Sequence, residues 1–405
     1  MPQQSDSDPF SWAATAGRRA EWTENRQGTG GIVNPPVWRA STILYPSIAA
    51  MEAADRHPDD TLYYGRKGTP TTWALREALT GLEPGAAGTM LFSSGVAAMT
   101  GAMLAVLKPG DHLLVPDSAY EPTTAFSRGL LKRLGVEAES YDPLIGGGIA
   151  ARLRPNTSLL VLESPGSLTF EVQDVPAMTA AARRAGVATL IDNTWAASHY
   201  FKGIGAGCDL VAQALTKYVG GHSDLMMGSV SATAEWFPRL RSTAWALGAC
   251  VSGDEAALAL RGFRTLPLRM ERHQRSALKV ARWLQEQPLV DRVLHPALPD
   301  CPGHEIWARD FSGSSGLFGL VLKVGTRADA ATFCDGLRHF GLGYSWGGFE
   351  SLCVPTSPEK LRRPGGFRPA GLSLRLSIGL EDPDELIADL AAALGRMERL
   401  PASGE

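Results

Sequence analysis

The stretch LVAQALTKYVGGHSD occupies residues 210–224 and joins a short apolar run to a turn that contains two glycines. The run 210–214 has the length of a buried β-strand. Lys217 follows this strand directly, and open α/β sheets bind ligands at the carboxyl ends of their strands. A lysine amine held there can form an imine with an aldehyde, provided that its surroundings favour the neutral amine. A solvated lysine at a strand end is the alternative, and for a lone lysine it is the more common case.

Short apolar runs and helix-like stretches alternate from about Thr71 to Arg264. Residues 176–184 are rich in alanine and are followed by Gly186, which predicts a covering helix and its C-terminal stop. Alternation of this kind predicts an α/β fold with a mostly parallel sheet covered by helices. The expected strands are residues 89–92, 112–116, 158–162, 188–191, 210–214 and 228–231.

The two ends of the chain follow different patterns. Residues 1–62 are irregular and rich in Pro, Gly and Ser, which predicts an extended arm without sustained helix, of the kind that reaches a neighbouring subunit. After Leu266 the order of elements changes, which predicts a smaller α+β domain. Its expected elements are a helix at 268–287, strands at 316–324 and 373–378, and a closing helix at 383–400. The expected domains are therefore residues 1–70, 71–265 and 266–405.

Composition and charge argue against several classes of partner. The 405 residues hold 39 Lys and Arg against 42 Asp and Glu without a long run of like charge, so nothing indicates a nucleic-acid or membrane surface. The five cysteines are widely spaced without a CxxC pair, which favours reduced thiols in a cytoplasm over disulfides or a zinc site. The N-terminus lacks the apolar core of a signal peptide, and residues 96–107, the longest apolar stretch, are too few to span a membrane. A small-molecule partner is expected.

Two further features lie at the same expected edge of the sheet as Lys217. Asp192 ends the apolar run in ATLIDNTW, where a carboxylate needs a cation such as a protonated pyridine nitrogen. A helix-capping aspartate is the plain alternative. Residues 93–96, SSGV, join a strand to an alanine-rich helix whose first N–H groups can receive a phosphate. A single turn of this kind is weak support by itself, because many such turns only connect elements.

Four more side chains suit the binding of a planar, anionic ligand. Tyr64 and Arg66 place a phenol and a guanidinium two residues apart, both able to hold phosphate oxygens, although a surface turn is equally plausible. Tyr120 follows an expected strand and can stack on a planar ring or simply pack in its loop. Arg375 interrupts an apolar strand and needs a partner, either a substrate carboxylate or an internal acid. The histidines show no ligand spacing, so no metal is expected.

Taken together, nine segments of the chain resemble the transsulfuration (Cys/Met metabolism) family of pyridoxal 5′-phosphate (PLP) enzymes over about residues 25–400, and within it the bacterial cystathionine β-lyase branch. The resemblance implies a type I PLP fold with a seven-stranded sheet, a PLP-binding domain over residues 71–265, and a homotetramer whose active sites are shared between subunits. The segments are YYGRKGTPT (63–71), FSSGVAAMTGAML (92–104), AYEPT (119–123), LESPGS (162–167), IDNTWAA (191–197), LTKYVGGHSD (215–224), SSGLFGLVL (314–322), YSWGGFES (344–351) and RLSIGLED (375–382).

The resemblance also implies a role for each candidate residue. Lys217 is the expected imine-forming lysine and proton shuttle, Asp192 the partner of the pyridine nitrogen, and Tyr120 the stacking ring. The expected phosphate ligands are Gly95, the backbone of Val96, Thr216, and Tyr64 and Arg66 from the adjacent subunit. Arg375 with the Ser345 and Trp346 segment is expected to hold the substrate α-carboxylate, with Trp245 near the distal end of the substrate. Lys217, Tyr64 and Tyr120 are the expected catalytic residues.

The chain departs from the family pattern at two positions. Ala214 stands where many relatives place a phosphate-binding serine, so one hydrogen bond worth about 1 kcal/mol is missing. Trp245 stands where the β-lyase branch is expected to have a tyrosine, which could shift the preference from cystathionine toward cystine or another thioether.

These implications predict a PLP-dependent carbon–sulfur β-lyase that cleaves L-cystathionine to homocysteine, pyruvate and ammonia. Two alternatives remain open: a γ-acting relative, which is either a cystathionine γ-synthase or a γ-lyase, and a PLP-binding regulator without turnover. The intact set of Lys217, Asp192 and Arg375 argues against the regulator.

Overall fold

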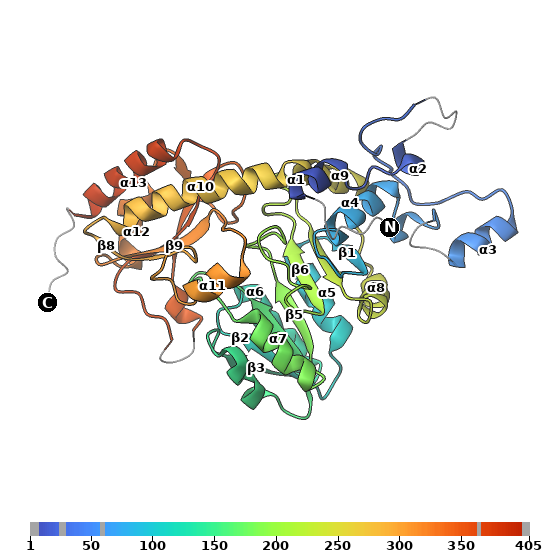
Figure 1. Ribbon diagram of the computed structural model, residues 1–405, viewed down its shortest axis with the longest axis horizontal. Helices are drawn as coiled ribbons and strands as arrows, with labels where there is room; N and C mark the ends of the chain where they lie inside the picture. The colour runs from blue at the N-terminus through green and yellow to red at the C-terminus, as the bar shows by residue number, and fades with distance from the viewer. Residues whose placement is uncertain (1–7, 24–29, 57–60, 363–365, 399–405) are drawn as a thin grey trace. The chain divides into compact units, whose positions relative to one another are not determined.

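The computed structural model describes residues 8–23, 30–56, 61–362 and 366–398. The chain divides into two compact units, each of which is built from two segments (Figure 1). The first unit comprises Met1–Leu107 and Lys202–Pro267, and the second comprises Lys108–Phe201 and Leu268–Glu405.

The first unit holds three strands of the large sheet, in the order β1-β7-β6. Strand β7 pairs antiparallel with both neighbours, so β1 and β6 run in the same direction. The strands are β1 (Gly88–Phe92), β6 (Leu210–Ala214) and β7 (Gly228–Ala232). The helices are α1 (Pro9–Thr15), α2 (Ala20–Thr23), α3 (Ile48–Arg56), α4 (Pro70–Thr80), α5 (Gly95–Val106), α8 (Phe237–Ala246) and α9 (Gly253–Arg264), with a 3₁₀ turn η1 (Gly65–Lys67).

The second unit holds the parallel part of that sheet, in the order β5-β4-β2-β3. Strands β2, β4 and β5 are almost fully buried, as expected for parallel strands covered on both faces. The elements are β2 (His112–Pro116), α6 (Glu121–Phe126), a π-helical turn η2 (Ser127–Leu131), β3 (Glu137–Tyr141), a 3₁₀ turn η3 (Gly146–Arg152), β4 (Thr157–Glu163), α7 (Val175–Arg184) and β5 (Ala188–Asp192). Within the described residues the large sheet therefore has seven strands, the number that the resemblance implied.

A second, five-stranded sheet in the order β10-β11-β12-β9-β8 forms the rest of the second unit. Helices α10 and α13 lie along it, and their apolar faces share one core with Phe318, Phe333 and Leu374 (Figure 1). The strands are β8 (Val290–Leu294), β9 (Leu317–Leu322), β10 (Phe340–Gly341), β11 (Ser351–Thr356) and β12 (Ser373–Ser377). The helical elements are α10 (Leu266–Gln285), α11 (His304–Asp310), η4 (Arg327–Asp329), α12 (Ala330–Cys334), η5 (Pro358–Lys360) and α13 (Pro383–Met397).

The predicted α/β class and every predicted strand are confirmed, and β3, β8, β10 and β11 are additions. The prediction of an arm without sustained helix is wrong over Pro9–Thr15 and Ile48–Arg56. Helix α1 forms because Asp8 caps its N-terminus and Pro9 suits its first turn, and because Trp12 is buried and donates to the Ala78 carbonyl at 3.1 Å. No helix among the described residues is long and apolar enough to cross a bilayer.

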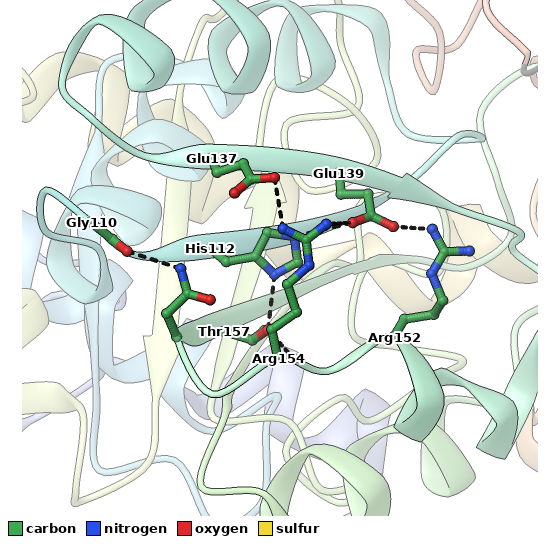
Figure 2. Close-up of polar contacts among 8 residues, drawn as sticks. Gly110, His112, Glu137, Glu139, Arg152, Arg154 and Thr157 are labelled. Carbon is green, nitrogen blue, oxygen red and sulfur yellow. Dashed lines mark hydrogen bonds and ion pairs between the residues drawn. The ribbon is translucent and has the colours of Figure 1, made fainter.

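A charged group that we call the amino-end cluster lies where β2, β3 and β4 begin, and consists of His112, Glu137, Glu139, Arg152 and Arg154 (Figure 2). Arg154 pairs with Glu137 at 2.7 Å and also with Glu139, which in turn pairs with Arg152. The buried His112 ring lies 3.6 Å from the Glu139 carboxylate. The amino ends of the parallel strands are therefore joined by paired charges.

Candidate active site

Lys217 lies in the turn that directly follows β6, where the sequence predicts it. Its main-chain N–H donates to the Ala214 carbonyl at 3.1 Å, and its carbonyl accepts from the Gly221 N–H at 2.8 Å. Helix α9 packs closely on this turn, since a Cβ on Gly262 would lie 2.2 Å from the Gly220 carbonyl oxygen. The half-buried Lys217 side chain therefore projects from a main chain that is fixed on both sides.

The N-terminus of α5 lies against the end of β6. Ser94 caps the helix by accepting from the Ala97 N–H at 3.1 Å. Only glycine fits at position 95, because a Cβ there would lie 2.5 Å from the Ala214 Cβ. The first N–H groups of a helix and its dipole attract anions, so the Gly95 and Val96 segment suits a phosphate.

Thr216 has a hydroxyl that is already engaged by the main chain of Met227. It accepts from the Met227 N–H at 3.0 Å and donates to the Met227 carbonyl at 3.2 Å. A hydroxyl has one proton to donate, so Thr216 would have to release Met227 in order to donate to a phosphate oxygen.

The segment with Tyr64 and Arg66 lies beside Trp245 in the first unit. Arg66 donates to the Trp245 carbonyl at 3.1 Å, and the Lys67 ammonium lies 3.4 Å from the centroid of the Trp245 ring. Contacts of this kind between a cation and an aromatic face are stabilising. Sequence reasoning did not single out Lys67, although its place next to Arg66 in YYGRKG was a usable signal.

Asp192 and Glu163 end the neighbouring strands β5 and β4 and are partners in the pairing of these strands. Asp192 accepts from the N–H and the hydroxyl of Thr194 in a turn, and no helix directly follows it, so the alternative of a helix-capping aspartate is wrong. The main-chain N–H of Tyr120 donates to the Glu163 carboxyl at 2.7 Å. Loss of hydration raises the pKa of Tyr120, and the charge of Asp192 raises it further.

Glu163 is a residue of this edge that sequence reasoning missed. Desolvation by the surrounding protein raises the pKa of its carboxyl well above the usual value, and the nearby Asp192 adds to this effect. Its position was visible in the sequence, since Glu163 ends an apolar run in LESPGS just as Asp192 ends one in ATLID.

Arg375 lies in the middle of β12 beside the Ser345 and Trp346 segment. One of its guanidinium nitrogens donates to the Ser345 carbonyl at 2.8 Å, and Ser345 adopts a left-handed φ of 74° that few non-glycine residues adopt. Its Nε is buried and has no hydrogen-bond partner among the described residues. Burial lowers the pKa of Arg375. A guanidinium in this state suits a carboxylate ligand that binds through two oxygens.

Comparison with known proteins decides the family. The model of the Cys/Met metabolism PLP-dependent enzymes matches residues 18–395. The chain belongs to this family. PLP is therefore its cofactor, as the resemblance implied.

The relatives of this PLP enzyme include cystathionine β-lyases from two bacteria. It is 45% identical to that of Escherichia coli over 380 residues, which cover 92% of this chain and 96% of the relative. It is 45% identical to that of Haemophilus influenzae over 374 residues, which cover 91% and 94% of the two chains. The solved cystathionine γ-synthase of Xanthomonas oryzae, in complex with aminoacrylate and cysteine, is 33% identical, with a TM-score of 0.87 over 97% of this chain and 99% of that one.

The residues present fit PLP in each unit taken by itself. In the first unit, the α5 N-terminus suits its phosphate, and Lys217 supplies an amine for its aldehyde. In the second unit, Asp192 suits a protonated ring nitrogen, and the buried Nε of Arg375 suits the carboxylate of an amino acid. Among the described residues no group of three His, Cys, Asp or Glu side chains could hold a metal.

Proposed function

We propose that this PLP enzyme is a carbon–sulfur β-lyase that, with one water molecule, cleaves L-cystathionine to homocysteine, pyruvate and ammonia. The observation that carries the proposal is the similarity to cystathionine β-lyases, at 45% identity over 92% of the chain. The γ-synthase of Xanthomonas oryzae is more distant, at 33% identity, although it shares the fold.

The chemistry divides between the cofactor and the chain. When bound, PLP supplies an aldehyde for the substrate amine and a ring that withdraws electrons from the bond that breaks. Lys217 then removes the proton from the substrate Cα, so that homocysteine thiolate can leave from Cβ. The carboxylate of Asp192 would hold a proton on the ring nitrogen of the bound cofactor.

The phosphate and the substrate are held by separate groups. The N–H groups of Gly95 and Val96 at the start of α5 would bind the phosphate, and Thr216 would join them only by releasing Met227. Arg375 would bind the substrate α-carboxylate through the side of its guanidinium that includes the buried Nε. Tyr120, at the N-terminus of α6, would stack on the ring of the cofactor.

The proposed enzyme is a cytoplasmic homotetramer in which Tyr64 and Arg66 reach the phosphate of a neighbouring subunit. The arm of residues 1–70 supports this assembly because it exposes large apolar side chains, with Leu44 at 91%, Ile48 at 67% and Val33 at 64%. A second subunit would cover them. The PLP-binding domain over residues 71–265 and the C-terminal domain over 266–405 complete the proposed organisation.

The distal end of the substrate is proposed to meet Trp245. Its ring already carries the Lys67 ammonium on one face, so this region offers a cation and an apolar surface rather than the hydroxyl expected there. This replacement favours a test with several thioethers and with cystine.

Product analysis of the purified holoenzyme tests the proposal. Cystathionine, cystine and methionine are offered at equal concentration, and the keto acid and thiol products are quantified. Pyruvate with homocysteine from cystathionine is expected. 2-Oxobutyrate, or synthesis of cystathionine from an activated homoserine, would make the chain a γ-acting enzyme. Absence of any keto acid from the whole panel would point to a regulator.

A further inference from the structure

Glu163 occupies a position at the carboxyl edge of the sheet that the proposed chemistry does not use. It is the last residue of β4, and its partner in the strand pairing is Asp192, the last residue of β5. Its main-chain N–H donates to the Gln173 side chain at 3.0 Å, which fixes the end of the strand. Its carboxyl therefore projects from a fixed main chain at the edge where Asp192 lies.

This carboxyl contacts the main chain of Tyr120 and also that of Ser167. The Tyr120 N–H donates to Glu163 at 2.7 Å, and Tyr120 is the residue that precedes α6. The phenol of Tyr120 makes no capping hydrogen bond to the helix. The orientation of the phenol therefore depends on the main-chain conformation of Tyr120. Glu163, at the end of β4, fixes that main chain through its hydrogen bond.

The loops on either side of this contact are joined to each other. The Ser167 N–H donates to the Ser118 carbonyl at 2.8 Å, and a Cβ on Gly166 would lie 2.6 Å from the Ser118 Cβ. Arg362 donates to the Asp117 carbonyl at 2.6 Å and to the Ser167 carbonyl at 2.7 Å. These contacts hold the loop before Tyr120 close to the loop after Glu163, so the hydrogen bond between the two residues can keep its geometry.

We propose that Glu163 is a positioning residue, which fixes the Tyr120 main chain and thereby orients the phenol that the proposed function assigns to the cofactor ring. The inference rests on that assignment. The charged and titratable groups that face the Glu163 carboxyl are Asp192 from β5, Arg362 from the segment after η5, and Tyr120. Desolvation and Asp192 raise the pKa of Glu163 well above its usual value, so a neutral acceptor is sufficient for its task.

The test compares a variant that keeps the acceptor with one that removes it. Glu163→Gln retains an oxygen that can accept from the Tyr120 N–H, whereas Glu163→Ala leaves this N–H without an acceptor. We expect Glu163→Ala to raise the dissociation constant of PLP about tenfold and to reduce the visible circular dichroism of the bound cofactor. Glu163→Gln is expected to stay within about twofold of the wild type in both measurements.

Hydrogen exchange of the holoenzyme measures the hydrogen bond between the Tyr120 N–H and Glu163 independently of catalysis. In Glu163→Ala the peptide that contains the Tyr120 amide should exchange about tenfold faster than in the wild type, and in Glu163→Gln it should not. Glu139→Gln is the matched control, because it removes a carboxylate from β3 in the amino-end cluster and should leave both the Tyr120 exchange and the cofactor spectrum unchanged. If Glu163→Ala does not fold, Glu163→Asp replaces it, since the shorter side chain withdraws the carboxyl from Tyr120.

Unchanged exchange at Tyr120 in the alanine or aspartate variant overturns the inference, whatever the enzyme cleaves. Equal losses in the glutamine and alanine variants also overturn it, because a neutral acceptor would then be insufficient. Faster exchange with an unchanged cofactor spectrum overturns the link from Tyr120 to the ring. Failure of the wild type to cleave cystathionine would count against the β-lyase proposal alone, since both readouts need only bound PLP.

Discussion

The parallel part of the large sheet carries acidic groups near both of its edges, on β3 at the amino edge and on β4 and β5 at the carboxyl edge, and the surroundings shift their pKa values in opposite directions. At the amino ends, hydrogen bonding to Arg152 lowers the pKa of Glu139, with further contributions from the charges of Arg152 and Arg154. At the carboxyl ends, desolvation and the charge of Asp192 raise the pKa of Glu163 well above its usual value. The parallel part of the sheet thus has paired charges at its amino edge and, where β4 and β5 end, a region that disfavours a second negative charge.

This difference suggests different roles for the two edges of the sheet: the amino edge stabilises the fold, and the carboxyl edge is suited to binding a ligand. The amino-end cluster satisfies its charges internally, so it has little need of a ligand (Figure 2). At the carboxyl ends two acidic residues occupy paired positions in adjacent strands, an arrangement that a cation would stabilise. The ring nitrogen of PLP is such a cation in the proposed enzyme. Perturbed groups gather at functional sites for this reason.

The largest effect should come from the carboxyl end of β6. Lys217→Ala removes the amine proposed to hold the cofactor and to move the Cα proton, so turnover should fall by about 10⁴-fold or more. The visible absorption band of the protein-bound cofactor should change as well. Spectra and pyruvate formation measure both effects, with Lys279→Ala as a control for the loss of a lysine on the exposed side of α10. Activity close to that of the wild type would refute the assignment of Lys217.

Arg375→Ala should have the second largest effect, and it should act on the substrate rather than on the cofactor. Losing a guanidinium that holds a carboxylate through two hydrogen bonds should raise KM for cystathionine by about 100-fold, while the dissociation constant of PLP changes by less than about threefold. Steady-state kinetics and a cofactor titration make the comparison, with Arg375→Lys as the matched variant. Equal losses of substrate and cofactor binding would contradict the proposed role.

The sequence predicts the strands well because their apolar runs are buried on both faces. It does not predict β3, since its sequence EAESY is polar and its position at the sheet edge leaves only Tyr141 fully buried. It also misses helix α1, whose stability depends on Trp12 contacting Ala78, a residue 66 positions away. Local pattern is informative where burial makes a run of residues continuously apolar, and neither β3 nor α1 contains such a run.

Some residues of the candidate site can likewise be predicted from the local sequence, and others cannot. Lys217 and Asp192 can be predicted because each directly follows or ends an apolar strand. The engagement of Thr216 by Met227 cannot, because it depends on how the turn after β6 returns toward β7. The amino-end cluster is equally hidden, since β2 lies between β3 and β4 and Glu139 meets arginines that precede β4. Only the order of strands in the sheet brings these charges together.

The pH dependence of stability should differ in sign between the two ends. The folded-state pKa of Glu139 is depressed, so its contribution to stability is present above the unfolded pKa and is lost as the pH falls through the folded value. The folded-state pKa of Glu163 is raised, so its contribution is present below the unfolded pKa and is lost as the pH rises through the folded value. Glu139 therefore contributes most to the stability of the fold at neutral pH, and Glu163 contributes most at acidic pH.

Urea midpoints of Glu139→Gln and Glu163→Gln, each relative to the wild type from pH 4 to pH 8, measure this difference. Glu139→Gln should lose stability at pH 7 and approach the wild type near pH 4, whereas Glu163→Gln should gain relative to the wild type as the pH rises. An effect of about 1 kcal/mol is expected for each. Taking differences removes the contributions of His273 and His295, which burial gives pKa values of about 4 and which both variants retain. Profiles of the same sign would break the contrast between the two ends.

The last comparison concerns Ala214, the last residue of β6. Its Cβ lies close to the N-terminus of α5, since a Cβ on Gly95 would be 2.5 Å away from it. A serine hydroxyl there would lie beside the N–H groups proposed to bind the phosphate, and one added hydrogen bond to a charged group contributes about 1.5 kcal/mol. Ala214→Ser should therefore lower the dissociation constant of PLP roughly tenfold.

Titration of the cofactor-free enzyme with PLP measures this change, and Ala214→Cys is the matched control because it adds a group of similar size that is a weak donor. Tighter binding by the serine variant alone would show that the phosphate lies within reach of both β6 and α5. Equal affinities of the serine and cysteine variants would place the phosphate away from this helix terminus. The carboxyl end of β6 would then have no part in binding the phosphate. In that respect it would resemble the amino-end cluster, whose charges are already paired with one another.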